Sequence, residues 1–172
     1  MDATTLAAYR ANKDDYLRTN EHSPLPPEQR DGFTGLPYYD WNPDLIFHVD
    51  LQSADGEDVT IDTSDGTTRI YKRSAEVIIK FADKDHTLTL FDTGHPGLFL
   101  PFRDATSGES TYGGGRYLDL QPDDEDHVTV DFNLAYSPYC AYNDVYSCAL
   151  PPAENWIDVP IEAGEKAWNR PD

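Results

Sequence analysis

The sequence that says most about the fold is EVIIKFADKDHTLTLFD, residues 76–92. Apolar side chains occupy every second position on both sides of a polar turn: Val77, Ile79 and Phe81 before it, Leu88 and Leu90 after it. This alternation is typical of strands with one buried face. The Asp83-Lys84-Asp85 turn predicts that the two strands form an antiparallel hairpin.

The same pattern continues on both sides of this hairpin. Upstream, apolar residues alternate over 45–52 and again at Val59 and Ile61, with Asp55-Gly56 predicting a hairpin turn between these two strands. Downstream, short strands are expected at residues 98–102, 116–120, 128–132 and 156–161. Short strands at regular spacing predict an all-β fold, a mainly antiparallel barrel or sandwich.

Three segments are expected within a single domain that spans residues 1–172. Residues 2–19 predict an N-terminal α-helix, because their apolar residues recur at helical spacing. Residues 20–44 contain five prolines, which oppose a regular element and predict an ordered strap. Residues 45–172 form the β domain, and its later part, rich in Pro, Gly and Asn, predicts a long ordered loop region.

The chain is strongly acidic. It carries 23 Asp and 9 Glu against 5 Lys and 8 Arg, a net charge of −19. Aromatic residues make up 12% of the chain, which with the regular alternation argues for a folded protein rather than a disordered one. An excess of Asp over Glu with few Lys is typical of proteins that work in molar salt, where counterions screen charge within about 3 Å. A halophilic source is therefore predicted.

The charge also limits the partners. It argues against binding to nucleic acid or to an anionic membrane surface. No apolar run approaches the ~18 residues of a membrane-spanning helix, and the N-terminus lacks the pattern of an export signal. We therefore expect a soluble, cytoplasmic protein whose two cysteines are thiols. The oligomeric state stays open.

The stretch from Phe99 to Asn155 holds both cysteines and six of the eleven tyrosines. Its most specific motifs are Phe102-Arg103-Asp104, Gly115-Arg116-Tyr117-Leu118, Asp131-Phe132-Asn133, Pro138-Tyr139-Cys140-Ala141-Tyr142-Asn143 and Tyr146-Ser147-Cys148. With Phe33-Thr34-Gly35-Leu36 upstream, these motifs resemble the bacterial and archaeal domain-of-unknown-function family 1684. The resemblance implies a mainly β fold, and it brings no established activity.

Two arginines of this stretch are the leading candidates for ligand recognition. Arginine is scarce in the chain, and a guanidinium binds carboxylates and phosphates through paired hydrogen bonds. Tyrosines and asparagines nearby could complete an aromatic pocket with a few fixed polar groups. The expected ligand-binding residues are Arg103, Asp104, Tyr112, Arg116, Asn133, Tyr139, Tyr142 and Asn143. The alternative is structural: an Arg–carboxylate network that holds loops, with Tyr and Asn satisfying buried backbone groups.

Catalytic chemistry is less well indicated. Cys140, Asp131 and Glu154 are the candidate catalytic residues, and a reactive Cys140 would need a neighbouring base. The histidines do not cluster, and His95 at the end of a strand is the best candidate among them. No Cys or His spacing indicates a metal site, and Gly113-Gly114-Gly115 lacks the Lys-Ser/Thr of a phosphate loop. Whether the protein uses a cofactor stays unknown from the sequence.

Three hypotheses follow. The first is a protein that binds a small polar or anionic molecule in a pocket lined by Tyr, Arg and Asn. The second is a hydrolase-like enzyme, and the third is a purely structural domain. The first hypothesis predicts that Arg116→Ala abolishes ligand binding and leaves the fold intact.

Overall fold

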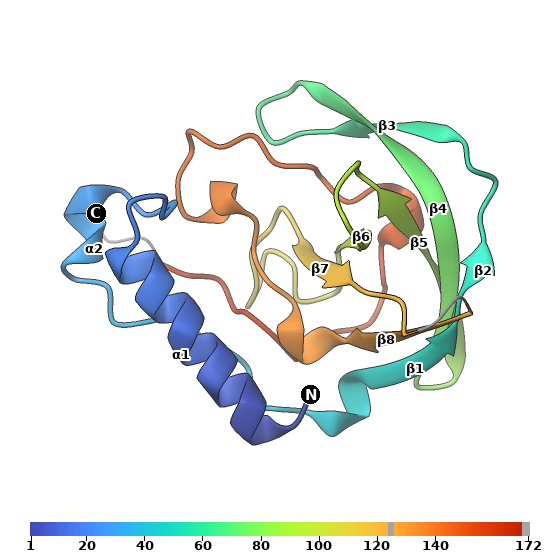
Figure 1. The fold of residues 1–172 in the computed structure, drawn as a ribbon, viewed down its shortest axis with the longest axis horizontal. Helices are drawn as coiled ribbons and strands as arrows, with labels where there is room; N and C mark the ends of the chain where they lie inside the picture. The colour runs from blue at the N-terminus through green and yellow to red at the C-terminus, as the bar shows by residue number, and fades with distance from the viewer. Residues whose placement is uncertain (124–125, 170–172) are drawn as a thin grey trace.

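The computed structural model, which describes residues 1–123 and 126–169, places eight strands beside one long N-terminal helix (Figure 1). The helices are α1 (Ala3–Thr19) and α2 (Pro27–Arg30). The strands are β1 (Ile46–Asp50), β2 (Gln52–Ser53), β3 (Asp58–Asp62), β4 (Thr68–Phe81), β5 (Lys84–Asp92), β6 (Leu98–Phe102), β7 (Arg116–Leu120) and β8 (His127–Asp131). The acidic turn at residues 123–126 lies partly outside the described residues.

The strands form two antiparallel sheets. One sheet pairs β1 with β8, and the other runs in the order β2-β4-β5-β6-β7, with β3 also paired to β4. The sheets do not close into a barrel, and one apolar core lies between them, so the fold is sandwich-like. The predicted all-β class with an N-terminal helix is confirmed.

The core is built by the alternation seen in the sequence. The β4–β5 hairpin turns at Ala82 and Asp83, with Phe81 paired to Lys84. The five alternating apolar residues of the hairpin are all buried: Val77, Ile79, Phe81, Leu88 and Leu90. Phe132, directly after β8, packs edge-on against Phe81 and Phe102, with ring centroids 5.6 and 5.2 Å apart.

Three local predictions are wrong. The β4–β5 turn lies at Ala82 and Asp83, whereas Lys84 and Asp85, which were predicted to be part of it, pair with β4 as the first residues of β5. Asp55-Gly56 does not form a hairpin, because β2 and β3 both pair with β4 and run along the same edge of it. The Asp55 carboxylate accepts a hydrogen bond from the Glu57 amide at 3.0 Å, so the local turn interrupts one edge strand without reversing the chain. Residues 156–161 form no strand, although the Ile157 amide donates to the Arg103 carbonyl at 2.7 Å; Pro160 lacks the donor that a regular ladder needs.

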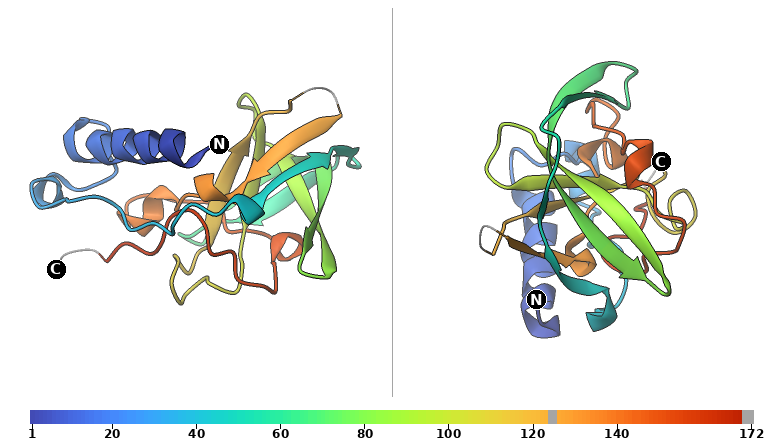
Figure 2. Two further views of the ribbon diagram at one scale, coloured as in Figure 1. Left: turned by 90° about the horizontal axis from the view of Figure 1, so that it is seen from below. Right: turned by 90° about the vertical axis from the view of Figure 1, so that its right-hand side faces the viewer.

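The helix α1 lies to one side of the sheets (Figure 2). Asp2 caps its N-terminus by accepting a hydrogen bond from the Thr5 amide at 2.9 Å, and Leu6 and Leu17 are its buried residues. The Pro-rich strap is ordered, and it contains one short helix, α2, because Pro27 occupies a position at the helix start where its missing N–H is tolerated. Leu25, Phe33 and Leu36 of the strap form a second apolar cluster with Leu17 and Tyr142.

After β8 the chain runs through three short 3-10 turns: Phe132–Leu134, Tyr139–Ala141 and Ala153–Asn155. Residues 132–169 contain no extended strand, and side chains of this segment contact both α1 and the sheets. The predicted long ordered C-terminal loop region is therefore confirmed. A cleft lies where the sheets, this loop region and α1 meet.

Candidate functional site: a tyrosine-lined cleft

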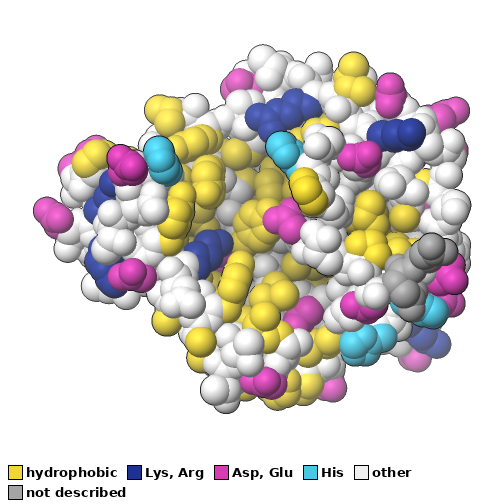
Figure 3. Space-filling model, in the orientation of Figure 1, with side chains coloured by type: hydrophobic (Ala, Val, Ile, Leu, Met, Phe, Trp, Pro, Cys, Tyr) yellow, Lys and Arg dark blue, Asp and Glu magenta, His cyan; other side chains and the backbone are white. Residues whose placement is uncertain are grey.

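The cleft consists of two adjoining cavities of about 690 and 520 Å³. Figure 3 shows this face of the molecule, with hydrophobic side chains gathered in a hollow at its centre. The two cavities share the lining residues Tyr117, Asp119, Tyr136, Ser147 and Cys148. We call the combined space the tyrosine cleft.

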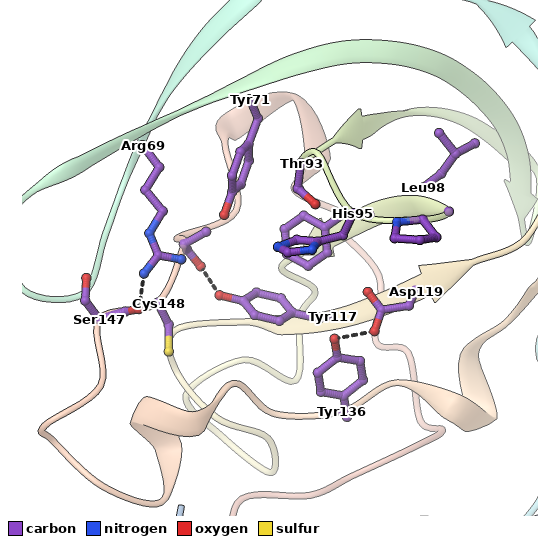
Figure 4. Close-up of a pocket in the computed structure, with 14 residues that line it drawn as sticks. Arg69, Tyr71, Thr93, His95, Leu98, Tyr117, Asp119, Tyr136, Ser147 and Cys148 are labelled. Atoms are coloured by element: carbon purple, nitrogen blue, oxygen red, sulfur yellow. Dashed lines mark hydrogen bonds between the residues drawn. The ribbon is translucent and has the colours of Figure 1, made fainter.

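The wall formed by the sheet comes from β4 and from the loop before β6. Arg69 and Tyr71 project from β4 toward the same space as Tyr117 of β7 (Figure 4). His95, in the loop between β5 and β6, lines this wall too. These residues lie far apart in the sequence, and the sheet brings them together because β4 and β7 flank β5 and β6.

The opposite wall is one face of α1. Tyr9, Lys13 and Tyr16 line the smaller cavity. They follow the i, i+4, i+7 spacing that places side chains on one side of a helix. Tyr139 and Tyr146 close this end of the cleft, with ring centroids 5.3 Å apart.

A row of aromatic rings forms the floor of the cleft. Tyr71 lies edge-on to Phe99 at 5.8 Å, Phe99 to Tyr117 at 4.8 Å, and Tyr117 to Tyr136 at 5.8 Å, measured between ring centroids. Each edge-to-face pair favours one arrangement of its rings. The floor is therefore a preformed apolar surface.

Polar groups on this floor are fixed by hydrogen bonds. The Tyr136 hydroxyl donates to the Asp119 carboxylate at 2.6 Å, and the Tyr117 hydroxyl donates to the Ala149 carbonyl. Burial raises the pKa of both tyrosines, so both hydroxyls stay protonated at neutral pH. Arg69 donates to the Ser147 carbonyl at 2.5 Å, which leaves further donors of its guanidinium to face the cavity.

Lys13 brings a second positive charge to the cleft. Its ammonium group lies 5.0 Å from the centroid of the Tyr136 ring and forms an ion pair with Glu165. The Glu165 carboxylate is buried and also accepts hydrogen bonds from the Ser137 amide at 2.8 Å and the Tyr142 hydroxyl at 2.5 Å. Glu165 therefore holds Lys13, and with it α1, against the C-terminal segment.

The two cysteines are buried thiols that no disulfide joins. Cys148 lines both cavities, and its sulfur accepts a hydrogen bond from the Cys140 amide at 3.3 Å. Hydrogen bonds from the Cys148 thiol and the Tyr112 hydroxyl lower the pKa of the Cys140 thiol. The pKa of Cys148 is raised in turn, because its proton is held between the two sulfurs.

A family model described as "Protein of unknown function (DUF1684)" matches residues 31–166. The chain belongs to the DUF1684 family. The resemblance drawn from the sequence motifs is thus confirmed. A search of curated proteins finds no match.

A solved structure supports the fold of this DUF1684 chain. It is the solution NMR structure of an uncharacterised protein from Haloarcula marismortui, a halophilic archaeon. The two sequences are 42% identical, and the alignment covers 95% of this chain and 92% of the other, with a TM-score of 0.73. The organism agrees with the salt adaptation expected from the composition.

Arg116, in a DUF1684 motif, lies away from the cleft and is fully buried. Its guanidinium donates to three backbone carbonyls: that of Ala163, that of Ile161 at 2.8 Å and that of Glu165 at 3.2 Å. It also forms an ion pair with the Asp104 carboxylate at 3.3 Å. Asp104 also accepts a hydrogen bond from the Ile161 amide at 2.7 Å. This environment favours the structural alternative for both residues, an Arg–carboxylate network that holds the C-terminal loop.

Asp131 and Asn133 also form hydrogen bonds within the protein. Asp131 accepts hydrogen bonds from the Met1 amino group at 2.9 Å and from the Asn133 amide at 3.0 Å. Asn133 exchanges two hydrogen bonds of 2.8 Å with the backbone of Asn42 in the strap. The pair therefore fixes the strap beside the end of β8.

The remaining tyrosine and asparagine candidates divide between the cleft and the loop interior. Tyr139 lines the cleft. Tyr142 is buried against Glu165, Tyr112 contacts Cys140, and Asn143 donates to the Pro24 carbonyl at 3.1 Å. Of these four, Tyr139 alone faces the tyrosine cleft.

The three candidate catalytic residues lie in three different environments. Asp131 binds the N-terminal amine, Cys140 contacts the other thiol, and Glu154 pairs with Arg73 of β4 at 3.0 Å. The structure therefore does not assemble them into one site. His95 lines the cavity of about 690 Å³, which Cys148 also lines.

Most of the cleft lies outside the residues that the sequence predicts to bind a ligand. Arg69, Tyr71, Asp119 and Lys13 line it and are not among those residues, and the sequence offers no partner for His95. One signal was available: the helical spacing of Tyr9, Lys13 and Tyr16 places a basic residue between two tyrosines on one face. Their meeting with β4 and β7 depends on tertiary structure.

Within residues 1–123 and 126–169, no three His, Cys, Asp or Glu side chains gather as metal ligands would. The helices in that part of the chain are all too short or too polar to cross a bilayer.

Proposed function

We propose that this protein binds a small organic molecule in the tyrosine cleft, with an apolar or aromatic body on the ring floor and an anionic group near Arg69 or Lys13. The supporting observation is the cleft itself: a preformed aromatic floor that two of the chain's few cations approach from opposite walls. Ligand sites usually combine apolar walls with a few convergent polar groups.

The charge of the chain adds weight to this proposal. A protein with a net charge of −19 repels anions, so a site for an anionic molecule requires local positive charge. Arg69, which forms no ion pair among the described residues, supplies it, whereas Lys13 is already paired with Glu165 and Asp119 accepts a hydrogen bond from the Tyr136 hydroxyl. Tyrosine hydroxyls on the floor can donate to the bound molecule or accept from it.

The first test is native mass spectrometry of the protein purified in high salt without added ligand. A reproducible extra mass, released on denaturation, supports the proposal and identifies the molecule. The second test is NMR titration at constant ionic strength with benzoate and with benzyl alcohol, which has a similar ring and no charge. We expect benzoate to shift the resonances of the cleft residues and benzyl alcohol to shift them less.

Matched variants decide whether the cleft is responsible. Arg69→Gln removes the charge on the β4 wall, and Arg18→Gln removes the same charge from the exposed Arg18–Asp15 pair on α1. We expect Arg69→Gln to weaken benzoate binding and Arg18→Gln to leave it unchanged. If no ligand copurifies and neither probe shifts the cleft residues, the binding proposal fails and the structural hypothesis takes its place.

We also propose that the protein works in the reducing, salt-rich cytoplasm of a halophile. The two thiols and the acidic composition support this. Stability that rises with added KCl, together with thiols that stay reduced in cell extracts, would support it. Stability that falls with added salt would argue against it.

A further inference from the structure

We infer that Arg103 and Trp156 form a second binding site, for a small oxyanion such as a carboxylate or a phosphate, separate from the tyrosine cleft. Arg103 lines a cavity of about 600 Å³ together with Gly113, Gly114 and Trp156. None of the residues around this cavity lines the tyrosine cleft. The inference therefore goes beyond the proposed function and does not depend on it.

The inference rests first on the partners of the Arg103 guanidinium. Among the described arginines, it is the one whose guanidinium has no hydrogen-bonded or ion-paired partner, and its contact is the Trp156 ring, 5.2 Å from the centroid. The chain has 32 acidic residues, so an arginine without a carboxylate is unexpected here. Its planar group has five N–H donors, and an oxyanion is the partner that matches their geometry.

The second step is that the rest of the chain holds this arginine in place. Its amide donates to the Asn155 carbonyl at 3.1 Å, and its carbonyl accepts from the Ile157 amide at 2.7 Å. Gly115, with φ of +89°, packs against its stem, because a Cβ there would lie 3.1 Å from the Arg103 Cγ. The Trp156 ring is held too, since its indole N–H donates to the Pro151 carbonyl at 2.9 Å.

These contacts fix the backbone and the stem of Arg103, and they hold the Trp156 ring that its guanidinium lies over. A preorganised donor loses less side-chain freedom on binding than a free surface arginine does. Trp156 is 56% exposed and extends the site with an aromatic surface. Asp62 is the acidic residue on the lining of the cavity, and its charge repels an oxyanion, so binding is expected only close to the Arg103 guanidinium.

The site can be tested by ¹H–¹⁵N NMR titration with inorganic phosphate and with acetate, at constant ionic strength in KCl. Both the Trp156 indole N–H and the Arg103 Nε–H signals report on it, and the indoles of Trp41 and Trp168 serve as internal references. We expect saturable shifts of the first two signals with at least one probe. Saturation with phosphate alone assigns the site to phosphoryl groups, and saturation with acetate assigns it to carboxylates.

Variants then test the role of Arg103. Arg103→Gln should weaken binding about tenfold or more, because a charge-assisted hydrogen-bond pair is lost. Arg103→Lys keeps the charge and loses the planar arrangement of donors, so it should bind the oxyanion more weakly than the native protein does. This variant also provides the test if Arg103→Gln does not fold. Arg18→Gln is the matched control for charge. Linear shifts without saturation for both probes, or equal affinity of Arg103→Lys and the native protein, would overturn the inference.

Discussion

Replacing Arg116 by alanine tests whether this residue holds the fold or binds a ligand. The substitution removes the donor from three backbone carbonyls of residues 161–165 and from the Asp104 carboxylate. The side chains of Arg116 and Asp104 are both fully buried. Water cannot replace the lost donor without opening the C-terminal loop.

The size of the effect follows from that burial. Removing one partner of a buried ion pair typically costs about 3–5 kcal/mol, since the other charge is left uncompensated. A domain of this size is stable by about 5–15 kcal/mol in total. We expect Arg116→Ala to lower the free energy of unfolding by about 4 kcal/mol, which shifts the urea midpoint by roughly 2 M if m is about 2 kcal/mol/M.

Urea unfolding in molar KCl, followed by tryptophan fluorescence and by circular dichroism, measures this loss. Arg18→Ala, which breaks an exposed pair on α1, is the control and should cost less than about 0.5 kcal/mol. A native-like Arg116→Ala protein that loses less than about 1 kcal/mol would refute the structural role. It would also restore the original expectation that this arginine binds a ligand.

Three further predictions concern single side chains. Tyr136→Phe removes the hydroxyl that donates to Asp119, and we expect the free energy of unfolding in urea to fall by about 1 kcal/mol with the cleft floor unchanged; an unchanged free energy of unfolding would contradict this. Hydrogen bonds from a lysine and a histidine of β5 lower the pKa of Asp158 to about 2, so its small stabilising effect is present above pH 4 and is lost as the pH falls toward 2. The thermal midpoint of Asp158→Asn should therefore lie below that of the native protein at pH 6 and approach it in acid; a constant difference would exclude the ion pair. Cys148→Ala should raise the pKa of Cys140, measured as thiolate absorbance near 240 nm against pH, and an unchanged midpoint would show that the second thiol does not stabilise the thiolate.

Much of the fold could be predicted because its causes are local. The alternation in β4 and β5 and the turn between them lie within 17 residues, and the helix begins at its own cap, Asp2. The Asp55-Gly56 prediction was wrong for a physical reason. A turn signal specifies a local change of direction, and only the pairing of β4 with both flanking segments shows that the chain continues along the same edge.

The candidate site was harder to predict because it depends on distant contacts. Arg103 and Arg116 look alike in sequence, since both are rare basic residues in a loop-rich stretch. Arg116 is enclosed by the carbonyls of residues 161–165, whereas Arg103 faces a cavity. That difference depends on how the C-terminal loop folds back on β7. The residues next to Arg103 and Arg116 in the sequence do not predict this packing.

The interrupted edge beside β4 has a consequence for the behaviour of this protein in concentrated salt. A continuous edge strand offers its free backbone groups to a second molecule, and acidic proteins usually prevent such pairing by repulsion. In molar salt that repulsion is screened within about 3 Å, which is shorter than the roughly 4.8 Å between paired strands. The turn at Asp55-Gly56 breaks the edge into segments of two and five residues, so its protection comes from backbone shape and remains at any ionic strength.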